Sequence, residues 1–200
     1  MKKGIAITLV LCLLLILSAG CGNNSSNTQT LSYEKGILTE TSFESEYLDL
    51  RFSVPEGFEM ATEEYILDMM NIGAEVMDID EKTLEYASLT TVYEMMVFAE
   101  SGTPNVIVMV EKSPLSVDRY FDALESQLSQ MGYEFDEVTT TEVAGQSYQQ
   151  ISSSTESFGA FLIQSYLLRK IDDRIVGFIT TSTPDTEDEL NVLMKAFKKY

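Results

Sequence analysis

The stretch that decides the fold is residues 158–182, "FGAFLIQSYLLRKIDDRIVGFITTS". Two runs rich in aromatic and β-branched residues, 158–170 and 174–182, are separated by Asp172-Asp173, which favours a turn. The pattern predicts two consecutive strands. Further strands are predicted just before them, with glycines at or near the turns: 133–143, 147–155, Gly145 and Gly159.

Two more strand signals lie further towards the N-terminus. "VYEMMVFAE" (92–100) and "NVIVMVEK" (105–112) flank Ser101-Gly102-Thr103-Pro104, which predicts a hairpin with a four-residue connection. "YLDLRFSVPEGF" (47–58) alternates apolar and polar residues before Pro55-Glu56-Gly57, which predicts a strand followed by a turn.

Helical spacing of apolar residues appears between and after these strands. The clearest helix begins at Ser116 and ends at Gly132. The last one is expected to open with a Thr186/Glu189 capping box and to close with lysines that match the helix dipole. The four expected helices are 61–77, 80–89, 116–132 and 186–200, and the closing lysines are Lys195, Lys198 and Lys199.

This order of strands and helices predicts an α+β fold, a largely antiparallel sheet flanked by helices, in a single domain at 37–200. Three segments carry a family resemblance: "EYLDLRFSVPEGF", "NVIVMVEKSPLSVDRYFDAL" and "YLLRKIDDRIVGFITTSTPDTEDELNVLMKAF". Together they resemble the PsbP-like domains, α/β/α sandwiches found in many Firmicutes lipoproteins. The resemblance covers most of residues 45–198 and implies a scaffold used more for docking and assembly than for catalysis.

The N-terminal segment reads as an export signal. Lys2 and Lys3 precede an apolar run of 13 residues, Ile5–Leu17, which is shorter than the ~20 residues of a membrane-spanning helix. The following "LSAGC" resembles a bacterial lipobox, although Ser18 stands where Leu is usual. The resemblance implies a signal peptide at 1–20, removed before Cys21, and a diacylglycerol on the Cys21 thiol. We therefore expect a lipid-anchored protein at the cell membrane, facing outside the cytoplasm.

The composition after the signal defines a tether and excludes one class of partner. Residues 21–36 are mostly Asn, Ser, Thr and Gln and predict a lipidated N-terminus with a flexible linker. The mature chain has 11 basic and 32 acidic residues, a net charge of −21, so phosphate groups repel it and no nucleic acid is expected to bind.

Few residues offer catalytic or metal-binding chemistry. The chain has no His, and its two cysteines are Cys12 in the signal and Cys21. Nucleophile–His pairs, thiol catalysis and zinc sites are therefore not expected. Ser32-Tyr33-Glu34-Lys35 fits S-x-x-K without its companion motifs, so we interpret it as a chance match. We expect no catalytic residue, no resident metal and no cofactor.

Two acidic clusters and two methionine pairs are candidate ligand sites. "DIDEK" (78–82) lacks the glycine of a calcium loop, and "DTEDE" (185–189) fits the start of a helix. Met69-Met70 and Met95-Met96 could bind Cu(I) or line an adaptable groove, but their spacing favours core packing, which would bury one of Met95 and Met96.

Three functions remain open from the sequence. The favoured one is a non-catalytic docking or assembly domain, held by diacylglycerol on Cys21, that binds an envelope protein at the cell surface. The second is a binding module for a small ligand or a cation, Ca²⁺ or Cu(I). The third is an envelope hydrolase working through a pair of carboxylates, which needs two buried acids ~5–10 Å apart across a cleft.

Overall fold

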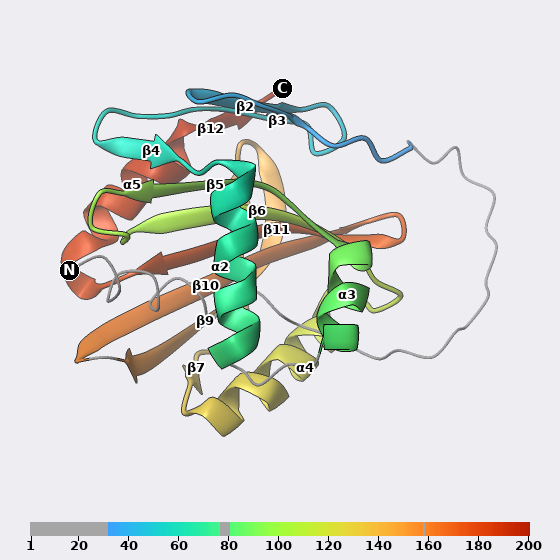
Figure 1. Ribbon diagram of the computed structural model, residues 1–200, viewed down its shortest axis with the longest axis vertical. Helices are drawn as coiled ribbons and strands as arrows, with labels where there is room; N and C mark the ends of the chain where they lie inside the picture. Colours follow the sequence, from blue (N-terminus) through green and yellow to red (C-terminus); the bar gives the residue numbers. More distant parts are fainter. Residues whose placement is uncertain (1–31, 77–80, 158) are drawn as a thin grey trace.

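The computed structural model describes residues 32–76, 81–157 and 159–200, and the fold is built around one large antiparallel sheet (Figure 1). Its strands run in the order β4-β5-β6-β11-β10-β9-β7, and β8 also pairs with β9. The strands are β4 (Phe58–Met60), β5 (Thr91–Ala99), β6 (Asn105–Lys112), β7 (Glu134–Phe135), β8 (Thr139–Val143), β9 (Gln146–Ser157), β10 (Ala160–Ile171) and β11 (Arg174–Ser182).

Both faces of this sheet are covered, which explains its continuous apolar strands. On β6, Ile107 and Met109 pack towards the helices, whereas Val106, Val108 and Val110 pack towards a second, smaller sheet. The same alternation separates Met95 from Met96, and both are buried, at 0% and 1% exposure. The prediction that only one of the two methionines is buried was therefore wrong, because it assumed a sheet with one solvent-exposed face.

Helices cover the first face of the large sheet, and the buried helical residues described there come from the first and the third of them. α2 (Glu63–Val76) crosses the large sheet, and α3 (Glu81–Thr90) and α4 (Val117–Leu128) lie beside it on the same side (Figure 1). α4 begins at Ser116, whose side chain accepts a hydrogen bond from the Arg119 amide, and is followed by a short 3₁₀ turn, Ser129–Met131. None of the described helices is long and apolar enough to cross a membrane.

The second face carries a four-stranded sheet and the last helix. The small sheet has the order β1-β2-β3-β12, with β1 (Ile37–Leu38), β2 (Ser42–Ser45), β3 (Leu50–Ser53) and β12 (Phe197–Lys199). Its inner residues Phe43, Phe52 and Phe197 join the core between the sheets, where Phe52 and Phe197 have ring centroids 4.5 Å apart. The sequence did not predict this second sheet.

The C-terminal helix is shorter than predicted. α5 (Glu187–Ala196) ends where β12 begins, so Lys198 and Lys199 belong to a strand and do not face the helix dipole. The capping box is also one turn earlier than expected: Thr183 and Thr186 form it around the 3₁₀ turn Pro184–Thr186.

One glycine marks a close contact between strands. Gly177 on β11 lies opposite Leu168 of β10, and a Cβ built on it would come within 1.9 Å of the Leu167 carbonyl oxygen. Any larger residue must push two central strands apart. With both faces packed in this way, the chain has the α+β fold with a largely antiparallel sheet that the sequence predicted.

Candidate functional site

The most unusual feature of the described structure is a buried carboxylate at a bulge in β5. The β5–β6 register pairs Tyr93 with Met109 and Met95 with Val108, so Glu94 is an extra residue between them. Bulges redirect side chains and are common beside functional sites. Glu94 is fully buried, although a charged group is costly to bury unless it is hydrogen-bonded.

The partners of Glu94 come from the N-terminal end of the described chain. The Tyr33 hydroxyl donates a 2.6 Å hydrogen bond to Oε1, and the Gly36 amide donates a 2.8 Å hydrogen bond to Oε2. Burial raises the pKa of Glu94 above its usual range, while these two donors and the charge of Lys35 lower it in part. For Tyr33, burial and then the Glu94 bond raise the hydroxyl pKa, so the phenol stays protonated and remains a donor.

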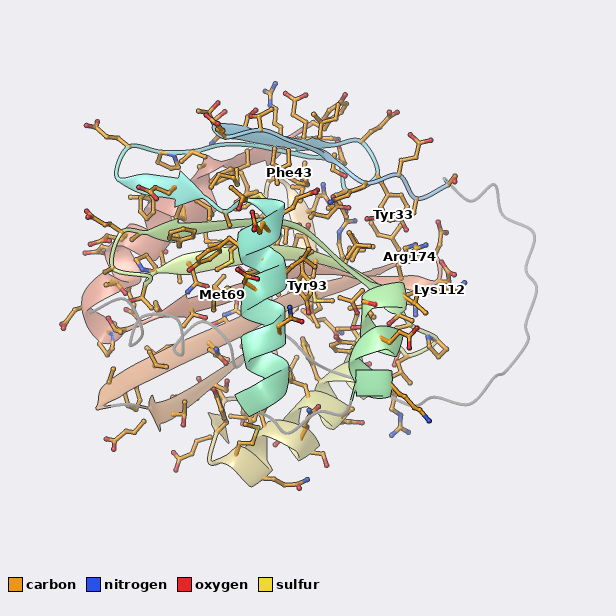
Figure 2. All side chains as sticks on the ribbon, viewed as in Figure 1. Tyr33, Phe43, Met69, Tyr93, Lys112 and Arg174 are labelled. Carbon is orange, nitrogen blue, oxygen red and sulfur yellow. The ribbon has the colours of Figure 1, made fainter. Side chains whose placement is uncertain are left out.

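Aromatic and cationic contacts complete the attachment. The Arg174 guanidinium lies 4.4 Å from the centroid of the Tyr33 ring, a cation–π geometry, and Figure 2 shows these two side chains together beneath the small sheet. Tyr47 meets the same ring edge-on at 5.2 Å. We call Tyr33–Gly36 together with Glu94, Tyr47 and Arg174 the N-terminal clasp.

Gly36 is required by the space available in the clasp. A Cβ at this position would lie 2.4 Å from the Phe43 ring and 2.8 Å from the Glu44 carbonyl oxygen. Tyr33–Gly36 thus packs against the domain, although it lies inside the segment 21–36 that the sequence predicts as a linker. The polar composition of that segment does not indicate that Tyr33 packs against the domain. The only signal in the sequence is its hydrogen-bond partner, Glu94, a single acid in the apolar run of β5.

A pocket of about 350 Å³ lies next to the clasp. Lys35 and Glu63 line part of the pocket and form a 2.5 Å ion pair that joins the N-terminal segment to α2. The remaining walls come from α2, the end of α3 and the start of β5: Ile66, Leu67, Ser88, Thr91, Val92 and Tyr93. Its volume is in the range of small-molecule sites, and its mainly apolar wall with three hydroxyl-bearing residues suits a small apolar group.

A second buried carboxylate lies on the other face of the large sheet. Glu111, 6% exposed, accepts a 2.7 Å hydrogen bond from the Tyr120 hydroxyl of α4. Burial raises the pKa of Glu111 to about 7. Glu94 binds residues of the N-terminal segment and Glu111 binds α4, so these two acids do not form the carboxylate pair that the hydrolase hypothesis requires.

The residues singled out in the sequence as candidates do not come together in one described site. Cys12, Cys21 and Asp78–Asp80 lie outside the described residues. Lys35 of the S-x-x-K match is paired with Glu63, and the acids at 187–189 occupy the first turn of α5, as predicted. Within 32–76, 81–157 and 159–200, no group of three or more Asp, Glu, His or Cys could hold a metal ion. Met69 is core, at 2% exposure.

No protein-family model and no curated protein matches the chain. Among solved structures, the chain is similar to a cyanobacterial PsbP, CyanoP from Synechocystis, with 9% identity and a TM-score of 0.49 over 92% of this chain and 99% of that chain. It is also similar to LpqN, a protein involved in cell envelope biogenesis of Mycobacterium tuberculosis, with 9% identity and a TM-score of 0.44 over 82% of this chain and 88% of that chain. At this level of similarity neither structure bears on the activity of this protein.

Proposed function

We propose that the protein is an exported lipoprotein, held at the outer face of the cell membrane by diacylglycerol on Cys21, whose domain docks a protein partner there without catalysing a reaction. The N-terminal clasp is the observation that carries this proposal. Because Tyr33–Gly36 is fixed to the large sheet, any anchor ahead of it is joined to the domain by no more than the ten residues between Cys21 and Ser32, which span about 40 Å at most. A docking domain benefits from such an attachment, since the body is kept close to the membrane.

The anchor is tested by replacing the acylated thiol. In cells, Cys21→Ala should leave the precursor uncleaved or release the protein from membranes, and the protein should leave the detergent phase. Cys12→Ala, inside the predicted signal, is the matched control and should behave as the wild type. Unchanged detergent partitioning of the Cys21→Ala variant would show that the chain is not lipidated.

The docking role is tested by cross-linking on intact cells, followed by mass spectrometry. One dominant partner should be recovered with the wild type and lost with a Gly177→Trp variant, because an indole ring cannot fit between the two central strands and the domain unfolds. Recovery of many unrelated neighbours, or of the same partner with the unfolded variant, would contradict the docking role.

The pocket between Lys35, α2 and Tyr93 favours a second function, the binding of a small apolar ligand. A panel of small apolar compounds should raise the melting temperature, because a ligand at 100 times its Kd stabilises the folded state by about 2.7 kcal/mol. Leu67→Glu, at an exposed wall of the pocket, should abolish the shift. Equal shifts in wild type and variant would place binding elsewhere.

A further inference from the structure

The negative charge of the protein is unevenly distributed between its layers. The small sheet and its loops, residues 37–53 and 197–200, contain four acidic and three basic residues, a net charge of −1. Residues 54–196, which form the large sheet and the helices, contain 27 acidic and seven basic residues, a net charge of −20. An anionic surface therefore repels the large sheet and helices, taken together, more strongly than the small sheet.

The outer face of the small sheet presents two neighbouring cations. The register places Ile37, Glu44, Arg51 and Lys198 in one row across the four strands, and all four side chains are exposed. Residues in the adjacent row point inwards: Leu38, Phe43, Phe52 and Phe197.

Arg51 and Lys198 lie directly opposite each other, an arrangement that destabilises a sheet when both residues carry the same charge. Among the described residues, neither has a carboxylate within 4.0 Å, although Glu44 is next to Arg51 in the row. A phosphate group placed between the two cations would remove their repulsion, and a guanidinium is well suited to bind it.

The N-terminal end of the described chain emerges at the edge of the small sheet. Ser32 and Tyr200 line one groove of about 360 Å³, together with Ile37 of β1, and Figure 1 places the blue end of the ribbon and the C-terminus along the small sheet. Ile37 is 70% and Tyr200 57% exposed. The ten residues between Cys21 and Ser32 allow a separation of about 40 Å at most.

We infer that the outer face of the small sheet rests on an anionic membrane, with Arg51 and Lys198 contacting lipid headgroup phosphates. The inference rests on the proposed lipid anchor and names the surface that the anchored domain turns towards the lipid. Ile37 and Tyr200, an exposed aliphatic and an exposed aromatic residue that line one groove at the edge of the small sheet, fit the headgroup region of a bilayer. The acidic large-sheet and helix side then faces away from the membrane and is free for a partner.

The orientation is measured on the full lipidated protein in vesicles of phosphatidylglycerol and phosphatidylcholine that carry brominated acyl chains. A bimane label on Ser53→Cys, on the outer face of β3, should be quenched more than a label on Ser126→Cys, on the exposed side of α4. The described residues contain no cysteine, so each label is unique in the folded body. Equal quenching at the two sites, in protein that stays anchored, would overturn the inference while leaving the anchor intact.

Charge reversal tests the two cations. Arg51→Glu with Lys198→Glu should reduce the membrane-facing population by at least about fivefold per charge, as expected for ~1 kcal/mol per basic residue at an anionic surface. Lys112→Glu with Arg119→Glu, also exposed, makes the same change in net charge and should leave the quenching at Ser53→Cys unchanged. Equal effects of the two double variants, or unchanged quenching in vesicles of phosphatidylcholine alone, would contradict binding through headgroup phosphates.

Discussion

At the scale of single residues, two buried glutamates dominate the electrostatics of the fold. Glu94 and Glu111 each accept a hydrogen bond from a tyrosine hydroxyl, and burial raises the pKa of both. Each is expensive to keep charged in the folded state, so each couples stability to pH.

Glu111 makes stability fall as the pH rises. Its folded pKa is about 7, above the ordinary 4.5, so its favourable contribution is complete below pH 4.5 and is lost as the pH rises through 7. Besides Tyr120, the charged group acting on it is Lys170 of β10, which lowers its pKa. We expect Glu111→Gln, which still accepts the Tyr120 bond, to raise the free energy of unfolding at pH 8 by up to about 3 kcal/mol.

Urea unfolding followed by circular dichroism at pH 5 and pH 8 measures this effect. The gain from Glu111→Gln should be larger at pH 8 than at pH 5. Glu125→Gln, on the exposed side of α4, serves as the control and should show no such difference. A gain from Glu111→Gln that is the same at both pH values would contradict the assignment.

Tyr33 is expected to hold the N-terminal clasp. Tyr33→Phe keeps the ring against Arg174 and Tyr47 but removes the donor to buried Glu94, at a cost of about 1.5–3 kcal/mol for a hydrogen bond to a charged group. Hydrogen exchange should then show faster exchange of the Gly36 amide. Tyr200→Phe, at an exposed tyrosine, should leave that rate unchanged; an equally protected Gly36 amide in Tyr33→Phe would mean that the hydroxyl is not needed.

At the scale of elements, the long strands were predictable and most of the short ones were not. Strands β9, β10 and β11 have 9 to 12 residues and clear turn signals, which sequence patterns detect well. The strands of the small sheet have two to four residues, and only β3 lies within a predicted strand, 47–58; β1, β2 and β12 are too short to establish a period. Phe197 also continues the helical spacing from Leu193, so the pattern predicts helix where β12 lies.

The N-terminal clasp could not be predicted from the sequence, because its residues are far apart along the chain. Tyr33 and Glu94 are 61 residues apart, and nothing in the polar stretch before Gly36 indicates that it packs against β5. The sequence marks Glu94 only as an acid in an apolar strand. Its partner depends on the fold of the whole chain.

Gly177 tests how tightly β10 and β11 are packed. Gly177→Ala places a methyl group against the Leu167 carbonyl, and overpacking of a core typically costs about 1–3 kcal/mol. We expect a lower melting temperature by calorimetry, with Ser154→Ala on the neighbouring β9 as a mild control. A melting temperature equal to that of the wild type would show that the strands can separate freely at this point.

At the scale of the whole molecule, the charge of −20 in residues 54–196 opposes the compact state. Raising sodium chloride from about 10 mM to about 500 mM shortens the screening length from 30 Å to about 4 Å, so the melting temperature should rise. Sucrose at equal osmolality is the control, since it leaves the charges unscreened. A melting temperature that does not rise with salt would show that self-repulsion is negligible.

The clasp also determines how the molecule responds to a mechanical load. A pull on the chain ahead of Tyr33 reaches the Tyr33–Glu94 hydrogen bond first and is transmitted to β5 in the large sheet. The two-residue strand β1 carries no tension until that bond breaks, and only then can it peel from β2. One of the two shortest described strands is thereby shielded from force by a buried acid.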